Sequence, residues 1–186
     1  MRPARQPGYA AAAESRPSSP DVKRPTRRRS AAACLRAQIV SEDIFEPEKL
    51  LQNDLVRSKL DWHEPIALLH MGTLHHYGGE DTRSRKDIMR AYIDALPSGS
   101  YVAISHFLDP EDEHSQVARK MEHLFLHSRM GSGTFSTRAE LQELFNGLEM
   151  VPPGLVPCSD WWPDGPQLKE KSAAQRRIAG GVARKS

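Results

Sequence analysis

Histidines and small polar residues follow or end two apolar segments of the chain, residues 66–71 and 100–106. They are Gly72, Thr73, His75, His76, Ser105 and His106. An imidazole can take up a proton near neutral pH or hydrogen-bond a ligand, and the alternative is a histidine satisfied by neighbouring backbone. Ser105 and His106 make a poor pair of nucleophile and base, because adjacent residues of a strand point to opposite faces. We therefore take His75 as the first candidate for a catalytic group and His76 as the second.

An acidic residue and an apolar residue, Asp43 and Ile44, follow a short predicted strand at residues 37–40. In a nucleotide-binding α/β sheet, an acid at this place can accept a hydrogen bond from an adenine amino group while the next apolar side chain covers the ring. The alternative is an aspartate that caps or solvates a loop. The residues alone leave both interpretations open.

The remaining motifs point away from metal and nucleotide-phosphate sites. His123 and His127 lie four residues apart in HLFLH, which lacks the glutamate of a zincin motif, so we predict no metal site. The segment from Gly131 to Gly133 lies between two predicted helices and reads as a linker. Cys34 and Cys158 form neither a CxxC motif nor an even ladder, which suits a reducing, cytoplasmic setting.

A strand-helix-strand unit would position the candidate residues. Residues 66–71 and 100–106 are apolar enough for buried strands, and the segment 84–96 between them begins with the capping pattern Ser84-x-x-Asp87. Strands joined by such a crossover are expected to be parallel. Sheets of this α/β class bind ligands beyond the carboxyl ends of their strands, where the histidines stand.

Further elements are predicted on both sides of this unit. Residues 47–60 and 113–130 show helical spacing, and the second helix would bury Val117, Met121, Leu124 and Phe125. Thr137-x-x-Glu140 is a capping box that opens a helix ending before Gly147. The segments LEMV and GLVPC then read as short strands.

Charge divides the 186 residues into three parts, with +6 in residues 1–33, −9 in residues 34–166 and +5 in residues 167–186. The two ends are too polar to build a core, so we predict basic disordered tails at 1–36 and 167–186 around a domain at 37–166. A solvated tail is favoured over nucleic-acid binding. No stretch approaches the roughly 20 apolar residues of a membrane span, and no signal peptide is indicated.

Several motifs together resemble a bacterial family of S-adenosylmethionine-dependent methyltransferases. They are EPIALLHMGTLHHY, LPSGSYVAISH, STRAELQELFNGLEMVPPGLVPCSDWWPDG and the acidic segment SEDIFEPEKLL. The resemblance covers residues 37–166. It implies the class I methyltransferase fold, a Rossmann-like core of seven strands with the last one antiparallel. It further implies S-adenosylmethionine as the cofactor, near Asp43, Ile44, Met71, Gly72 and Thr73, and a small-molecule acceptor that the resemblance does not specify.

The resemblance also implies parts that residues 1–36 do not supply. A complete member carries a first strand, a glycine-rich cofactor loop and an acid that holds the ribose hydroxyls. Residues 1–36 are rich in Ala, Arg and Pro and resemble a reading of the gene in another frame. We therefore expect a truncated or frameshifted member, weak or inactive as this chain and prone to self-association. The alternative is a non-catalytic remnant that binds a ligand or a partner.

Overall fold

A computed structural model describes residues 37–79, 82–163, 165–166 and 168–186. The predicted tail at 1–36 lies outside the described residues. Residues 40–186 form one compact unit, and the architecture below is that of this unit. Within the described parts, no helix is both long enough and apolar enough to cross a membrane.

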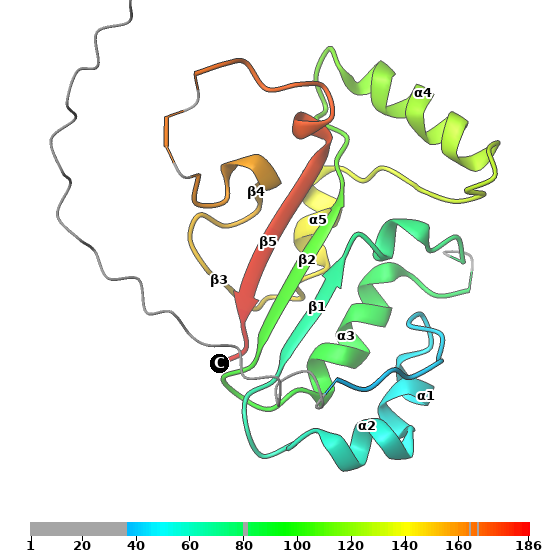
Figure 1. The fold of residues 1–186 in the computed structure, drawn as a ribbon, viewed down its shortest axis with the longest axis vertical. Coiled ribbons are helices and arrows are strands. Elements are labelled where there is room, and N and C mark those ends of the chain that lie inside the picture. The colour runs from blue at the N-terminus through cyan, green and yellow to red at the C-terminus, as the bar shows by residue number, and fades with distance from the viewer. Residues whose placement is uncertain (1–36, 80–81, 164, 167) are drawn as a thin grey trace, which may run out of the picture. The chain divides into compact units, whose positions relative to one another are not determined.

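A five-stranded mixed sheet forms the centre of this unit (Figure 1). Its order is β1-β2-β5-β3, and β4 pairs with the same edge of β5 as β3 does, at the other end of that strand. The strands are β1 (Ala67–Met71), β2 (Tyr101–Phe107), β3 (Glu149–Met150), β4 (Val156–Pro157) and β5 (Ile178–Arg184). β1 and β2 are parallel, with Ala67 opposite Tyr101 and Met71 opposite Ser105, whereas β5 is antiparallel to each of its neighbours. The predicted parallel pair is confirmed, and so are the two short strands after residue 147.

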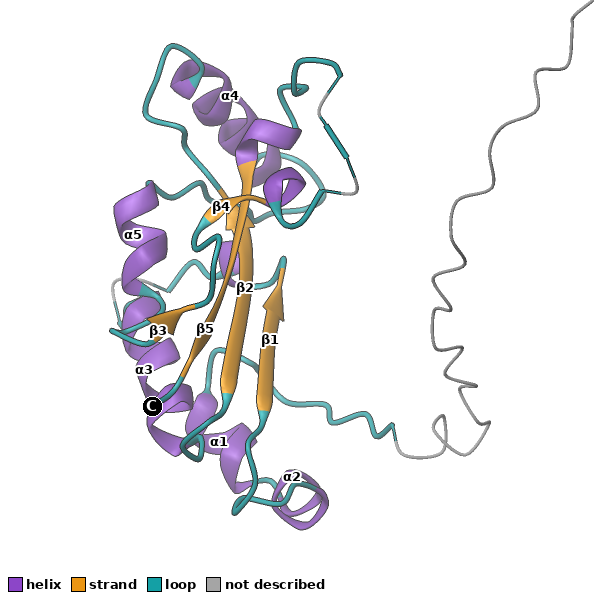
Figure 2. Cartoon of the chain, turned by 90° about the vertical axis from the view of Figure 1, so that its left-hand side faces the viewer, coloured by secondary structure: helices purple, strands orange, loops and turns teal. Residues whose placement is uncertain are grey.

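Helix α3 (Arg85–Ala95) connects β1 to β2 as the sequence predicts. Ser84 caps its first turn, because the hydroxyl accepts a hydrogen bond from the backbone N–H of Asp87. Its buried residues Ile88, Met89, Tyr92 and Ile93 pack in the core, which also takes in Val102 and Ile104 of β2. Helices α3 and α5 (Arg138–Glu143) lie on the same face of the sheet (Figure 2). The capping box predicted at Thr137 is present.

The predicted disordered tail at 167–186 is wrong for its second half. Residues Ile178–Arg184 form β5, which pairs with β2 along its whole length and with β3 and β4 on its other edge. Arg184 is the last residue of this strand, Arg177 and Lys185 flank it, and its middle is small and buried. A side chain at Gly180 or Gly181 would force its neighbours to shift, since an added Cβ would come within 3.0 Å of Cys158 Sγ or 2.9 Å of Phe145. The domain therefore extends well past residue 166.

Three smaller predictions also need correction. Residues 37–40 form no strand, and Ile39 is exposed. The helix predicted at 47–60 is two short helices, α1 (Pro47–Gln52) and α2 (Asp54–Lys59). Asn53 ends the first and caps the second, because its side chain accepts hydrogen bonds from two N–H groups of α2. The helix predicted at 113–130 is α4 (Ser115–Leu126), whose expected buried stripe fails at Val117 and Leu124, both exposed.

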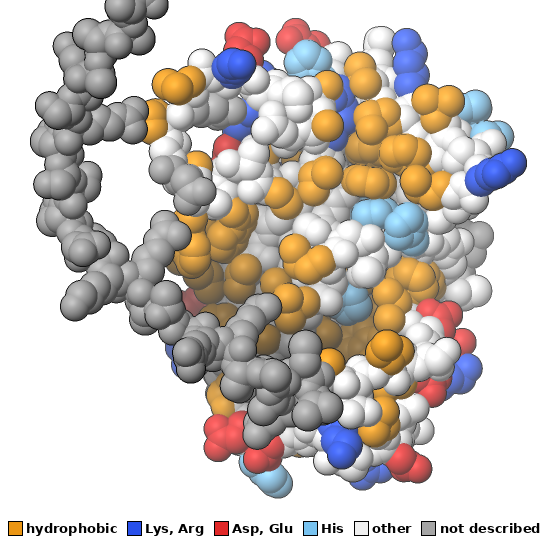
Figure 3. Space-filling view, in the orientation of Figure 1, with side chains coloured by type: hydrophobic (Ala, Val, Ile, Leu, Met, Phe, Trp, Pro, Cys, Tyr) orange, Lys and Arg blue, Asp and Glu red, His pale blue; other side chains and the backbone are white. Residues whose placement is uncertain are grey.

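The opposite face of the sheet is apolar and largely open. Leu69 and Met71 of β1 are 62% and 55% exposed, and Tyr101 of β2 is 43% exposed. Hydrophobic side chains gather over much of this side of the molecule (Figure 3). β1 pairs only with β2 among the described strands, so its outer edge offers unpaired backbone groups.

Candidate functional site

The carboxyl ends of β1 and β2 lie side by side, as the strand-helix-strand prediction requires. The backbone N–H of Gly72 donates to the carbonyl of Ser105 over 3.1 Å, which extends the pairing one residue past β1. Gly72 has φ +69°, a conformation that residues with a Cβ seldom adopt. The chain turns there into the short 3₁₀ helix η2 (Leu74–His76), which carries both predicted histidines.

His75 lies inside an aromatic cluster. Its ring stacks on Phe107 with 3.8 Å between the centroids and meets the ring of His106 edge-on at 5.5 Å. Its side chain is 5% exposed, and its Nδ1 has no hydrogen-bond partner among the described residues. Burial, together with the nearby His76 and Arg85, lowers the pKa of His75 to about 4. The imidazole is therefore neutral at pH 7 and is a weak proton acceptor that can still accept a hydrogen bond.

A second buried histidine, His106, is fixed by hydrogen bonds at both ring nitrogens. Its Nδ1 lies 2.8 Å from the carbonyl of Phe107, and its Nε2 lies 3.0 Å from Nη1 of Arg85. Since a guanidinium only donates, Nε2 is the acceptor and Nδ1 carries the proton. Burial lowers the pKa of His106 to about 3, although the hydrogen bond to Phe107 opposes this. His106 is thus held in one neutral tautomer.

Thr134 connects these groups to the segment that follows α4. Its hydroxyl accepts a hydrogen bond from Arg85 over 3.1 Å, and its N–H donates to the carbonyl of His75 over 2.8 Å. Nearby, the exposed His76 places Nδ1 2.9 Å from the hydroxyl of Ser132. Neither Arg85 nor Thr134 was predicted as a site residue, because Arg85 resembles an ordinary first-turn helix residue and Thr134 follows a segment interpreted as a linker.

The loop of Asp43 and Ile44 is linked to this end of the sheet through Tyr92. The Tyr92 hydroxyl donates to the Ile44 carbonyl over 2.7 Å, while its ring lies 5.3 Å from that of His70 on β1. Asp43 Oδ1 accepts from the N–H of Phe45 over 2.8 Å, as the loop-capping interpretation expects. The carboxylate is exposed, so its second oxygen remains open to a ligand.

His70 and Thr73 complete the end of β1. His70 is 4% exposed, its Nδ1 lies 3.2 Å from the Thr73 hydroxyl, and its Nε2 has no partner among the described residues. Burial lowers the pKa of His70 to about 4. Among the predicted cofactor residues after β1, Met71 points to the open face of the sheet, and Gly72 lies at the turn, where an added Cβ would stand 3.7 Å from the ring of His75. The structure brings them into one region with His75.

The mixed sheet, with its antiparallel last strand and its polar groups at the carboxyl ends of β1 and β2, is a Rossmann-like methyltransferase architecture. The profile of the S-adenosyl methyltransferase family matches residues 27–186. The chain belongs to that family, whose cofactor is S-adenosylmethionine.

Two solved structures support the same assignment. A candidate methyltransferase from Thermobifida fusca is 28% identical with a TM-score of 0.68, over 77% of this chain and 52% of its own. A DUF574 family protein from Streptomyces avermitilis is 32% identical with a TM-score of 0.67, over 79% of this chain and 54% of its own. The chain thus spans about half the length of these two proteins. No curated protein matches it.

Proposed function

We propose that this chain serves methyl transfer from S-adenosylmethionine to a small-molecule acceptor, and that by itself it holds the cofactor weakly. Two observations support the proposal: Gly72, Thr73 and His75 follow β1 in one turn, and Tyr92 connects the Asp43–Ile44 loop to His70 of β1. Asp43 and Ile44 would hold the adenine, and Met71, Gly72 and Thr73 would line the cofactor beside β1. The bound cofactor supplies an electrophilic methyl group.

The two predicted histidines take different roles in this proposal. Buried His75 is a poor base, since a group with a pKa of about 4 removes protons poorly. Its neutral imidazole suits a group that accepts a hydrogen bond and so orients the methyl-accepting substrate. His76 is exposed and next to Ser132, so a proton taken up there can pass to solvent. We assign the base to His76 and orientation to His75.

Weak binding follows from the groups that the described residues do not provide. No glycine-rich loop and no ribose-binding acid stand beside β1 in the described part of the chain, and the outer edge of β1 is unpaired. Two charge-assisted contacts at about 1.5 to 3 kcal/mol each correspond to a loss of roughly two to four orders of magnitude in affinity.

Calorimetry with S-adenosylhomocysteine tests the proposal, with the Thermobifida fusca protein titrated in parallel. We expect this chain to bind at least about 100-fold more weakly, and Asp43→Asn to reduce binding further. Asp61→Asn is the matched control, because exposed Asp61 also accepts a hydrogen bond from the N–H two residues on. No heat at millimolar ligand would refute cofactor binding, and micromolar affinity lost in Asp43→Asn would refute the weak-binding part.

A second candidate function, binding of a partner without catalysis, is favoured by the open edge and face of β1. We propose self-association through Leu69 and Met71, because an apolar face beside an unpaired edge pairs readily with another chain. Sedimentation velocity should show oligomers that Leu69→Glu reduces. Leu124→Glu is the control, since Leu124 is similarly exposed at 65% but lies on α4. A monomer at high concentration would exclude this candidate.

A further inference from the structure

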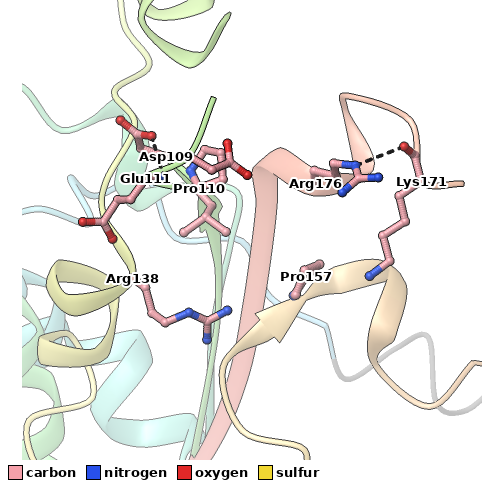
Figure 4. A pocket seen from close by; sticks show the side chains of 9 residues that line it. Asp109, Pro110, Glu111, Arg138, Pro157, Lys171 and Arg176 are labelled. Carbon is pink, nitrogen blue, oxygen red and sulfur yellow. Dashed lines mark hydrogen bonds between the residues drawn. The ribbon is translucent and has the colours of Figure 1, made fainter. Parts of the chain in front are cut away.

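A cavity of about 240 Å³ lies beyond the carboxyl end of β2. Acidic residues lie on one side, Lys171 and Arg176 on the other, and Arg138 enters from α5 (Figure 4). The charged lining residues are Asp109, Glu111, Asp112, Arg138, Lys171 and Arg176. The cavity shares the sheet end at which ligands of α/β proteins bind.

The arginines of this cavity hydrogen-bond backbone rather than carboxylates. Arg138 Nη1 donates to the carbonyl of Leu155, and Arg176 Nε donates to the carbonyl of Lys171 over 3.3 Å. Among the described residues, neither guanidinium has a carboxylate within the 4.0 Å of an ion pair. Lys171 differs, because it is paired with Asp160. Two cations without a carboxylate partner therefore line the cavity, Arg138 on the side of Asp109 and Glu111 and Arg176 on the opposite side (Figure 4).

The carboxylates of this cavity also lack close ion pairs. Burial opposes ionisation of Asp109, but hydrogen bonds from the Ser115 hydroxyl and the Glu111 N–H, together with the more distant charges of Arg119 and Arg177, keep the pKa of its carboxyl below the ordinary value. Asp109 and Glu111 have no lysine or arginine partner within ion-pair distance in the described part of the chain. Opposite charges thus face one cavity without closing on each other.

We propose that this cavity binds a small zwitterion, the size of an amino acid, as the charged end of the methyl acceptor. Its ammonium group would face Asp109 and Glu111, and its carboxylate would face Arg138 and Arg176, whose planar guanidinium groups match a carboxylate. A ligand with both charges compensates both the carboxylates and the guanidinium groups, whereas a singly charged ligand leaves one kind of charge without a counterpart. The role of the zwitterion as part of the methyl acceptor rests on the proposed function, but its binding in the cavity does not.

Titration of ¹⁵N-labelled protein with three probes of similar size tests the inference. β-Alanine carries both charges, propionate only the carboxylate and propylamine only the ammonium group. We expect β-alanine to shift the backbone amide signals of Asp109, Glu111 and Arg138 saturably, with a dissociation constant at least about tenfold lower than that of either other probe. Absence of saturable shifts, or equal affinity for propionate or propylamine, would overturn the inference.

Charge-removing variants locate the site. Arg138→Gln and Glu111→Gln should each weaken β-alanine binding about tenfold. Arg129→Gln and Glu113→Gln are the matched controls, because both residues are exposed and neither lines the cavity. Unchanged binding in both cavity variants, with native spectra, would refute the site. The titration contains no cofactor, so the two proposals can fail separately. Binding of β-alanine without binding of S-adenosylhomocysteine would remove only the role of the zwitterion as methyl acceptor. Binding of S-adenosylhomocysteine without binding of β-alanine would refute the zwitterion site and leave the proposed function standing.

Discussion

Replacing Lys185 with methionine removes the cation that closes the carboxyl end of α3. Lys185 Nζ donates to three backbone carbonyls, of Ile93 over 2.8 Å, Asp94 over 3.2 Å and Leu96 over 2.7 Å. These carbonyls belong to the last turn of the helix, where the usual partner four residues on is missing and the negative dipole end lies, although the Ile93 carbonyl also accepts the N–H of Leu96. The ammonium group therefore joins the end of β5 to the crossover helix.

The size of the effect follows from these contacts. A hydrogen bond to a charged group contributes about 1.5 to 3 kcal/mol, but water replaces part of this because Lys185 is only half-buried, and ordering a lysine side chain costs about 2 kcal/mol. We expect a net loss of about 2 kcal/mol in the free energy of unfolding. Methionine keeps the length and apolar stem of the side chain, so the change isolates the charge and its donors.

Urea unfolding followed by circular dichroism measures this loss. With a denaturant dependence of about 2 kcal/mol per molar urea, the midpoint should fall by about 1 M. Lys169→Met is the control, because Lys169 is exposed and makes no hydrogen bond within the described residues. A midpoint within about 0.2 M of the control would show that water satisfies these carbonyls as well as Lys185 does.

Three further results are expected. Acid should destabilise the fold below about pH 6.5, because the unfolded chain then binds protons that buried His70, His75 and His106 do not bind until about pH 4 or 3. At pH 5 each of these histidines should lower the free energy of unfolding by about 1 to 2 kcal/mol, which urea unfolding at a series of pH values measures. An unfolding free energy that stays constant from pH 7 to 5 would contradict this. Gly181→Val should lower the free energy of unfolding by about 1 to 3 kcal/mol, because the added Cβ would stand 2.9 Å from the side chains of Met150 and Phe145. An unchanged melting temperature would show that these side chains shift without loss of stability. Thr137→Ala should lower the free energy of unfolding by about 0.5 to 2 kcal/mol, because it removes the capping box of α5. The control is Ser128→Ala, a change at an exposed serine, and equal melting temperatures of the two variants would contradict the prediction.

The sequence predicted the parts of the fold that depend on strong local signals. β1, α3 and β2 were predicted because an apolar run, a capped helix and a second run follow one another, and chain chirality then requires parallel strands. β5 was not predicted, because its glycines and alanines carry no hydrophobic period. Their small size is a tertiary requirement, set by Phe145 and Cys158 far away in the sequence.

The candidate site was predicted in the same partial way. The position of His75 beyond β1 followed from topology, whereas its burial against Phe107 depends on packing across β2. The cavity charges escaped notice because Asp109 and Arg138 read as ordinary loop and helix-start residues. Arg176 lay in a segment interpreted as a tail, so only the return of β5 to β2 places it beside them.

The position of β5 has a consequence for biosynthesis. β5 lies between β2 and the pair β3 and β4, yet it is the last of these strands to leave the ribosome. Until residue 184 emerges, β2 has no neighbour on that side, and the strands made before β5 must wait with apolar surface exposed. A nascent chain stopped before Ile178 would therefore be a substrate for chaperones and proteases, and a premature stop codon late in the gene would abolish the fold as thoroughly as an early one.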